Sequence, residues 1–505
     1  MKKKNVVLAL GAAFSMMLGG CAVGPNFKPP EAALPGDASY TPTPLPAQTA
    51  AAPAGTVGGA AQQFVAGQDI PAQWWAIFHS PALDQLIRAA LEHNPSMAAA
   101  EAALRQAQES YLATAGSLAW PQVNGQVGAQ REKASAASTG GQNAGVFNLY
   151  NASVSVSYTP DVFGATRRAL EGAQAGVDYQ RYQVEATYLA LTANVVTTAI
   201  REASLRAQLK ASREVLDALT SQQGLIEKQF EFGAIPRNTL LTQRNQVAQV
   251  AATLPPLEKA LAQTRHQLSV LVGKLPGEQG MPVFELEALA LPEQLPVSLP
   301  SALVRQRPDI RASEELLHQA SAQVGVATAA QYPQFTLSGA YGSASTTAGD
   351  LFKSDNVLWN LGANMTAPIF NGGALAARKR AAEAAYDGAA AQYRATVLGA
   401  FQNVADALRA LDSDAAALKA QAEAEALAKE SLDLATQQYK LGGISYLVLL
   451  DAQRIYQQSH ISLVQAQSAR YADTAALFQA LGGGWWNRAG GVPGAAVATT
   501  SASQQ

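Results

Sequence analysis

The sequence is poor in several kinds of residue, and each shortage excludes a class of protein. Its 505 residues include one cysteine, so a disulfide framework within one chain and a metal site built from a cysteine cluster are both excluded. Charged residues make up 15% of the chain and aromatic residues 7%, which disfavours a large enzyme core rich in aromatic side chains. The 36 basic and 38 acidic side chains nearly balance, which disfavours a dedicated nucleic-acid-binding protein.

The single cysteine follows a short apolar segment at the N-terminus. Three lysines precede an apolar run over residues 6–18, and the motif Leu-Gly-Gly-Cys21 ends it. This order predicts a lipoprotein signal peptide over residues 1–20, because the motif resembles a bacterial lipobox, in which the cysteine is acylated and becomes the first mature residue. The alternative is an ordinary signal peptide followed by a chance cysteine. In the lipoproteins that this motif resembles, an aspartate after the cysteine retains the protein in the inner membrane, so Ala22 at this position favours the outer membrane.

Long apolar runs are also missing from the rest of the chain. No stretch of 18 consecutive apolar residues follows the signal, so any part that crosses a membrane is expected to do so with strands. Residues 21–73 are rich in Pro, Ala, Gly and Thr, and they are expected to form a lipidated, extended N-terminal segment that cannot bury a core.

The two halves of the remaining chain repeat each other at a spacing of about 209 to 213 residues. For example, the motif Gln229-Phe230-x-x-Gly233-x-Ile235 matches Gln438-Tyr439-x-x-Gly442-x-Ile444. We therefore predict a first structural repeat over residues 74–290 and a second over 291–484. Each would contain a helix, two strands, a long helix, a turn and a second long helix, and residues 485–505 would form a flexible C-terminal tail.

Each repeat contains two segments of alternating polarity. The expected strands cover about 122–131 and 151–159 in the first repeat, and about 334–341 and 358–367 in the second. Such alternation predicts a sheet with one apolar and one polar face. Open sheet edges in lipid leave backbone groups unpaired. Either these strands are therefore soluble, or several chains each give four strands to one closed barrel.

Long segments without proline follow the strands. No proline occurs between Pro160 and Pro236, or between Pro368 and Pro493. A helix over 165–232 would be about 100 Å long, and such a helix needs lateral partners along its whole length. A pair of prolines at 255–256 is expected to break the returning helix of the first repeat.

Several short motifs, spread from residue 18 to residue 486, occur in an order that carries a resemblance. They are Gly20-Cys21-Ala22-Val23-Gly24-Pro25-Asn26-Phe27, Trp74-Trp75-x-x-Phe78, Leu83-Asp84-x-Leu86, Asp161-Val162-Phe163-Gly164, Arg307-Pro308-Asp309-Ile310, Tyr332-Pro333 with Phe335, and Leu481-Gly482-Gly483-Gly484-Trp485. In this order the chain resembles the TolC-like outer-membrane efflux proteins of the lipidated, NodT-type group.

The resemblance implies a mainly α-helical fold with a transmembrane β part. It implies a homotrimer in which each chain gives four strands to a 12-stranded outer-membrane β-barrel, continued by a long periplasmic α-helical barrel. The implied function is the exit duct of a tripartite efflux pump, which passes small molecules passively from periplasm to exterior. Its implied partners are outer-membrane lipids, a periplasmic adaptor and an inner-membrane pump of the resistance-nodulation-division type. The implied location is the outer membrane, with a lipid anchor and an extension into the periplasm.

The resemblance also implies a gate at the periplasmic tip. In the family, a leucine ring and an aspartate ring constrict the channel, and Leu447 and Asp451 match these positions, while Arg454 matches a basic residue of the closing network. Leu447 and Asp451 are four residues apart and so share one helix face. The alternative is that Asp451 is a solvated acid and Leu447 packs ordinarily. The corresponding residues of the first repeat, Asn238 and Thr242, carry no charge, so the second repeat is expected to form the gate.

Two turns at about 232–237 and 441–446 mark the tip. By resemblance, residues in them would dock with the hairpin tips of the adaptor: Gly233, Ile235, Gly442, Gly443 and Ser445. Glycine permits the positive φ that favours a helix C-terminus, and Ser445 is expected to cap the next helix. The alternative, that both turns are simple caps, is compatible with docking.

No motif of an enzyme or a cofactor site stands out. The five histidines are scattered, Gly273-Lys274 lacks the upstream glycine of a phosphate loop, and no Gly-x-Ser-x-Gly elbow occurs. We therefore expect no enzyme, no metal site, no nucleic-acid partner and no cofactor besides the covalent lipid at Cys21. Two other functions stay open: the same duct in protein secretion, and a structural envelope lipoprotein that conducts nothing. The alternating strands favour a duct, since a tether needs no barrel.

Overall fold

The computed structural model describes residues 22–30, 40–133, 145–298 and 300–488. The chain forms two compact units. The first comprises Met1–Pro30, Ala103–Gln180 and Ala312–Arg394, and the second comprises Glu31–Ala102, Arg181–Arg311 and Ala395–Gln505. Each unit therefore draws segments from both sequence repeats. Cys21 and the expected signal peptide lie outside the described residues.

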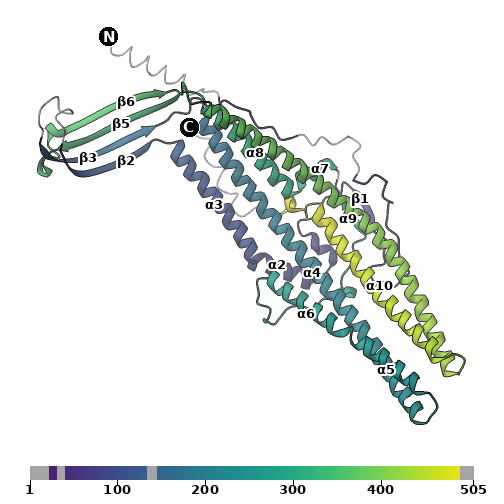
Figure 1. The fold of residues 1–505 in the computed structure, drawn as a ribbon. Coiled ribbons are helices and arrows are strands. Elements are labelled where there is room, and N and C mark those ends of the chain that lie inside the picture. The colour runs from purple at the N-terminus through teal and green to yellow at the C-terminus, as the bar shows by residue number, and fades with distance from the viewer. Residues whose placement is uncertain (1–21, 31–39, 134–144, 299, 489–505) are drawn as a thin grey trace. The chain divides into compact units, whose positions relative to one another are not determined.

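The first unit contains a four-stranded antiparallel sheet with the strand order β2-β3-β5-β6 (Figure 1). Its strands are β2 (Gln122–Lys133), β3 (Val146–Tyr158), β5 (Gln334–Ser345) and β6 (Val357–Thr366). The prediction of four strands per chain is confirmed. Strand β3 of the first repeat pairs with β5 of the second, so the sheet joins the two repeats, while β2 and β6 form its edges.

The register of the sheet separates polar from apolar side chains. Ser155 pairs with Ala340, and Ala340 pairs with Asn360, so these residues share one face. Residues one position along each strand point the other way, and there Leu361 is 80% and Trp359 69% exposed. The other face thus presents large apolar side chains outward from the single chain: Val123, Val127, Val154, Val156, Leu337, Tyr341, Trp359, Leu361 and Met365.

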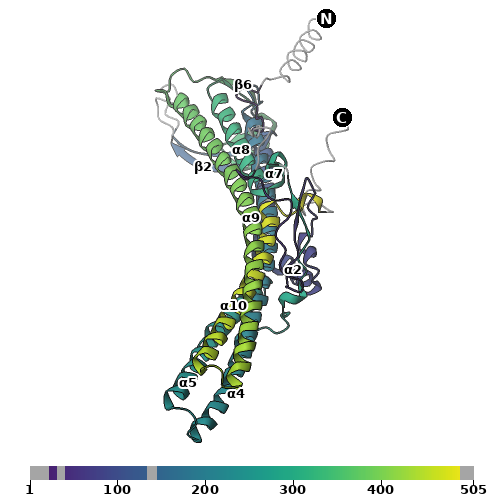
Figure 2. The same cartoon turned by 90° about the vertical axis from the view of Figure 1, so that its right-hand side faces the viewer.

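Two very long helices follow the two strand pairs. Helices α4 (Ala165–Glu231) and α9 (Ala374–Lys440) each contain 67 residues, as the proline-free segments predict. The returning partner of α4 is divided into α5 (Arg237–Ala251) and α6 (Leu254–Leu271), because Pro255 near the start of α6 has no N–H to continue a helix. The partner of α9 is the unbroken α10 (Tyr446–Ala480), which runs beside it (Figure 2).

Shorter elements complete the two units. The helices are α2 (Pro81–His93), α3 (Pro95–Leu118), α7 (Pro300–Gln306) and α8 (Pro308–Ala329), and the 3-10 turns are η2 (Trp74–Phe78), η3 (Leu286–Ala288), η4 (Ala348–Asp350), η5 (Ser354–Asn356) and η6 (Trp485–Asn487). Strands β1 (Gln63–Ala66) and β4 (Gln294–Val297) pair in parallel in the second unit. Among the described residues, no helix combines the length and the apolar character needed to cross a membrane.

The N-terminal segment is extended, but part of it is buried in the second unit. Thr49 and Gln62 are almost fully buried. The buried guanidinium of Arg470 donates to Gly58 O at 2.9 Å, to Thr49 Oγ1 at 3.1 Å and to Gln62 Oε1 at 2.8 Å. The segment thus buries no core of its own, yet it fills the core that other elements form.

The end of the second unit lies further along the chain than the sequence analysis expects. Trp485 Nε1 donates to Gln306 O at 2.6 Å, and Arg488 forms an ion pair of 2.5 Å with buried Glu185. These contacts correct the expected start of the flexible tail at residue 485, because residues 485–488 satisfy buried polar groups of the unit. Residues 489–505 of the expected tail lie outside the described residues.

Candidate functional site

The long helices α4 and α9 each end in a turn, and the two turns have the same geometry. In each turn one glycine, Gly233 or Gly442, has a φ of +71° or +74°. Its N–H donates to the carbonyl three residues back, and the next N–H donates to the carbonyl five residues back, over 2.8–3.0 Å. This is a Schellman motif, and it needs a positive φ that glycine adopts without strain. The internal repeat therefore extends to the hydrogen bonds of the two turns.

The residue before each returning helix has the same backbone geometry. Pro236 has φ −75° and ψ 153°, and Ser445 has φ −73° and ψ 154°. Ser445 occupies the N-cap position of α10, but its hydroxyl makes no hydrogen bond to the helix. The expected side-chain cap is therefore wrong. Proline, which has no hydroxyl, adopts this geometry equally well, so the turn sets the start of the helix and leaves the exposed hydroxyl to water.

An apolar cluster, called here the tip cluster, supports both turns. It consists of Ile226, Leu240, Ala435, Tyr446, Leu449, Leu450 and Ala452. Ile235 and Ile444, which are equivalent in the two repeats, pack against it from the two turns. Ile235 is thus partly buried, and its side chain fixes the first turn in place. Gly233, Gly442, Gly443 and Ser445 are exposed.

A buried polar chain crosses the tip cluster. The hydroxyl of Tyr446 on α10 donates to Gln243 Oε1 on α5, and Gln243 Nε2 donates to Leu219 O on α4 at 2.7 Å. Burial raises the pKa of Tyr446. Because a neutral hydroxyl can donate, the three helices are linked by hydrogen bonds that water does not reach. Sequence reasoning missed this link, since the residues lie far apart along the chain and do not match across the repeat.

The three expected gate residues share the exposed face of α10. Leu447 is 65% exposed, and the side chains of Asp451 and Arg454 are 57% and 67% exposed. Asp451 Oδ1 accepts a hydrogen bond of 2.7 Å from Arg454 Nη2. Their helix neighbours Leu449 and Leu450 point the other way, into the tip cluster. The structure therefore brings Leu447, Asp451 and Arg454 together and leaves them free for contacts outside the chain.

The first repeat carries its charges differently at the tip. Asn238 and Thr242, which correspond to Leu447 and Asp451, are exposed and uncharged. Glu227 on α4 instead forms an ion pair of 2.8 Å with Arg244 on α5, and hydrogen bonding from Arg244 lowers the pKa of Glu227. This pair joins two helices, whereas the Asp451 pair lies within one. The pair of Glu227 with Arg244 does not follow from any repeated spacing in the sequence.

Two exposed apolar side chains flank the tip turns. Phe232 and Leu441, the residues just before the two turn glycines, are each 86% exposed. They are equivalent in the two repeats, and neither side chain is covered within the described chain. Neither residue is among the predicted docking residues, although both lie directly before the turn glycines Gly233 and Gly442. Large apolar side chains at an exposed tip are typical of a surface that another protein covers.

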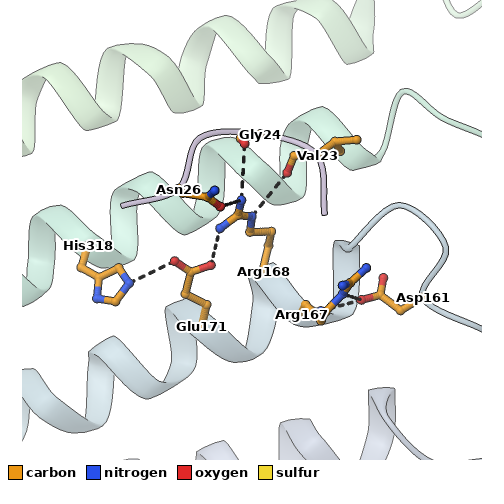
Figure 3. A network of polar contacts seen from close by, with 8 residues as sticks. All are labelled: Val23, Gly24, Asn26, Asp161, Arg167, Arg168, Glu171 and His318. Atoms are coloured by element: carbon orange, nitrogen blue, oxygen red, sulfur yellow. Dashed lines mark hydrogen bonds and ion pairs between the residues drawn. The ribbon is translucent and has the colours of Figure 1, made fainter. Parts of the chain in front are cut away.

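In the first unit, Arg168 on α4 holds the N-terminal arm, defined here as residues 22–30. Its side chain is only 5% exposed. Nη2 donates to Asn26 Oδ1 at 2.6 Å, and two longer bonds of 3.3 Å reach the carbonyls of Val23 and Gly24 (Figure 3). Nη1 donates to Glu171 Oε2 at 2.6 Å, which orients the guanidinium from the same helix.

A histidine on α8 extends this contact. His318 Nε2 lies 3.1 Å from Glu171 Oε1, and its ring stacks on Phe27 of the arm with ring centroids 4.3 Å apart. The arm is therefore fixed by one charged side chain from α4 and one aromatic ring from α8.

The start of the arm lies against the connection between β3 and α4. Val23 N donates to Phe163 O at 3.1 Å. Gly164 in this connection has a φ of +84°, and a Cβ there would lie 2.5 Å from the Cα of Ala22. Only glycine fits both the conformation and the space. The residue that follows Cys21 is thus held where the sheet of this unit passes into its helix.

No metal or cofactor site emerges from these contacts. Within the residues that the structure describes, no group of three or more His, Cys, Asp or Glu side chains could hold a metal ion. The chemistry of the tip is that of charge and apolar contact.

Comparison with known proteins decides the family. The family described as outer membrane efflux protein matches residues 86–274 and 299–483, which is most of the chain and covers most of each repeat. The chain belongs to this family. It is accordingly an outer-membrane channel component that extends into the periplasm, a transporter and not an enzyme.

Curated relatives and solved structures agree with this assignment. The pyoverdine export outer membrane protein OpmQ of Pseudomonas aeruginosa is 34% identical over 427 residues, which is 82% of this chain and 87% of OpmQ. The probable efflux pump outer membrane protein TtgC of Pseudomonas putida is 30% identical over 95% of this chain and 96% of its own length.

Two solved channels show the same fold. The outer-membrane channel OprN superposes with a TM-score of 0.82 at 26% identity, covering 92% of this chain and 100% of OprN. The open state of the Neisseria gonorrhoeae channel MtrE superposes with a TM-score of 0.75 at 26% identity, covering 92% of this chain and 99% of MtrE. The predicted family and fold class are confirmed.

Proposed function

We propose that this chain is the outer-membrane exit duct of an efflux pump and conducts small molecules passively from the periplasm to the exterior. The observation that carries the proposal is the two-faced sheet of the first unit, whose large apolar side chains are uncovered on one face. Burying such a face in lipid is favourable, while the polar face can line a water-filled passage. The names of curated relatives refer to pyoverdine, antibiotics and toluene, so small molecules are the class of cargo we infer.

The duct is formed, we infer, by a homotrimer. Strands β2 and β6 are edges, and open edges in lipid leave N–H and C=O groups without partners. Copies of the chain can pair these edges with one another. Three copies give twelve strands, and a barrel of that size leaves room for a lumen. Two copies would give only eight strands, and side chains fill the interior of a barrel of that size. Ser153, Ser155, Ser157, Asn360 and Asn364 would then face the water.

Cys21 would carry the lipid that anchors the duct. Each buried methylene of an acyl chain contributes about 0.8 kcal/mol to membrane binding, and two or more chains give stable anchoring. The contacts of Arg168 and Gly164 support this role, because they hold the residues after Cys21 beside the end of β3. A lipid on Cys21 would therefore be attached close to the sheet whose apolar face the membrane would cover.

Leu447, Asp451 and Arg454 would form the gate at the periplasmic tip. Around a narrow axis, leucines from three copies form a dry constriction, and three carboxylates attract cations and repel anions. Exposure of all three side chains on one helix face supports the assignment. The ion pair with Arg454 would partly neutralise each carboxylate and so weaken the repulsion among the three.

The tip turns would receive a periplasmic adaptor, which in turn joins an inner-membrane pump of the resistance-nodulation-division type. Gly233, Ile235, Gly442, Gly443 and Ser445 shape these turns. The uncovered side chains of Phe232 and Leu441 supply apolar area that an adaptor can bury. Opening would follow when docking moves α10 and separates the gate residues of the three copies.

Release of a small dye from liposomes tests the duct and its gate together. Liposomes containing the wild-type protein are expected to release the dye slowly, and Asp451→Ala is expected to speed release severalfold. Thr242→Ala, the matched change in the first repeat, is expected to leave the rate unchanged. Failure of the folded oligomer to release any dye in all three forms would reject the duct, whereas equal release from all three would reject only the gate.

A further inference from the structure

The connection from β6 to α9 carries two apolar side chains with nothing over them. Ile369 is 98% exposed and Phe370 is 90% exposed. Isolated apolar residues on a surface are common, but nearly complete exposure of two neighbours in an ordered connection is not. Within the residues that the structure describes, no contact therefore covers them.

The first repeat shows what a covering contact looks like. Its corresponding connection, from β3 to α4, reads Pro-Asp-Val-Phe-Gly over residues 160–164, and the connection from β6 to α9 reads Pro-Ile-Phe-Asn-Gly-Gly over residues 368–373. Both contain a proline and then a β-branched residue directly before phenylalanine, and both end in a glycine of positive φ, Gly164 or Gly373. In the first repeat Phe163 is partly buried, and its ring stacks on Tyr332 with centroids 4.8 Å apart and an interplanar angle of 24°. Tyr332 comes from the connection between α8 and β5, which belongs to the second repeat.

The repeat also identifies the counterpart of Tyr332. Tyr332 directly precedes Pro333 and strand β5, and Trp120 directly precedes Pro121 and strand β2. Trp120 is 69% exposed. The hairpin registers confirm the equivalence independently, because Gln122 pairs with Ser157 and the matching residue Gln334 pairs with Thr366. Phe370 and Trp120 thus correspond to the two rings that Phe163 and Tyr332 stack together within the described chain.

We propose that Trp120 of each copy stacks on Phe370 of the partner subunit and repeats, between copies, the contact of Phe163 with Tyr332. This proposal rests on the oligomeric duct described above and names the residues that hold its copies together at the junction of strands and helices. A second copy is the occupant because it alone supplies a β2 edge with Trp120 at its start, beside the β6 edge that ends next to Phe370.

The same equivalence gives the register between the copies. Within the chain, Val154 of β3 pairs with Tyr341 of β5. In the repeat, Val154 corresponds to Ala363 of β6, and Tyr341 corresponds to Ala129 of β2. The equivalent pair between copies is therefore Ala363 opposite Ala129 of the partner subunit. Two residues along, Met365 then lies opposite Val127 of the partner subunit.

In this register the apolar faces of the two neighbouring sheets lie on the same side. Met365 and Val127 both belong to the apolar face of the sheet, so the apolar face continues from one copy to the next. A slip by one residue would place Met365 opposite Gln126 or Gly128 of the partner subunit, both of which lie on the other face of the sheet.

Chemical cross-linking tests the proposal in the full-length protein. The variant Trp120→Cys with Phe370→Cys, treated with a short bifunctional thiol reagent, is expected to give dimer and trimer bands on a denaturing gel. Each single variant is expected to run as a monomer, which also controls for Cys21. The matched pair Phe163→Cys with Tyr332→Cys is expected to link within one chain and to stay at the monomer position.

A second probe covers the case in which loss of both aromatic rings prevents assembly. A photoreactive benzoylphenylalanine at position 120 keeps an aromatic ring there, and its cross-linked peptide is expected to contain Ile369 and Phe370 of the partner subunit. An oligomer of normal size that gives neither cross-link would overturn the stacking and leave the exit duct standing. A wild-type protein that stays monomeric by light scattering in detergent would overturn both.

Discussion

Replacing Arg168 by methionine should free the N-terminal arm while the rest of the chain stays folded. Methionine keeps the length and the apolar stem of the side chain but removes every hydrogen bond of the guanidinium. The bond to Asn26 at 2.6 Å and the two bonds of 3.3 Å to backbone carbonyls tie the arm to α4. The bond to Glu171 does not count here, because Glu171 lies on the same helix.

The structure allows the size of the effect to be worked out. A hydrogen bond to a charged group contributes roughly 1.5–3 kcal/mol, and a long, poorly placed one contributes about 0.5 kcal/mol. Taking about 2 kcal/mol for Asn26 and about 0.5 kcal/mol for each carbonyl gives about 3 kcal/mol. Since 1.4 kcal/mol corresponds to about a factor of ten, the arm should open about 100 times more often.

Hydrogen–deuterium exchange measures this opening directly. The amide of Val23 is protected by its bond to Phe163 O, and its exchange rate should rise about 100-fold in Arg168→Met. Arg167→Met is the matched control. Arg167 directly precedes Arg168 on α4, its side chain is 50% exposed, and it pairs with Asp161 at 3.3 Å. Ion pairs at the surface contribute about 0–1 kcal/mol to stability. An equal rise in both variants, or none in Arg168→Met, would refute the reasoning.

Three further predictions concern the arm, the tip cluster and the second unit. Gly164→Ala should lower the melting temperature more than Gly373→Ala: both positions have a positive φ, which strains an alanine by about 1–2 kcal/mol, but only at Gly164 does the new Cβ meet the arm. Tyr446→Phe should destabilise the protein by about 1–3 kcal/mol in urea unfolding, because it leaves a buried amide oxygen without a donor. Burial and the neighbouring Asp473 raise the pKa of Asp414 to about 7. The folded chain therefore holds a proton that the unfolded chain has lost, and stability falls as the pH rises from the ordinary carboxyl range to about 7. Asp414→Asn should raise the melting temperature more at pH 8 than at pH 5, and an equal gain at both values would contradict this assignment.

The long-range order of the chain could be predicted because it follows from spacing. Two proline-free segments gave α4 and α9, and the repeat gave two turns whose hydrogen bonds are the same in the structure. Alternation of polar and apolar residues gave the two faces of the sheet. These features depend on neighbours in sequence, and their periods can be counted directly.

Contacts between distant residues could not be predicted in this way. The bond from Tyr446 to Gln243 and the hold of Arg168 on Asn26 join residues more than 140 positions apart, and neither pair recurs in the other repeat. The missing cap at Ser445 has a different cause. Its residue type favours a cap, but the turn already fixes the backbone, as Pro236 shows.

Single-channel recording in planar bilayers tests the central claim most directly. The purified wild-type oligomer should give a small current that prefers cations, and Asp451→Asn should give a larger or less selective current, since it removes the carboxylates from the proposed constriction while keeping their shape. A folded oligomer that inserts and carries no current would contradict the exit duct. A large wild-type current that Asp451→Asn leaves unchanged would contradict the gate on α10.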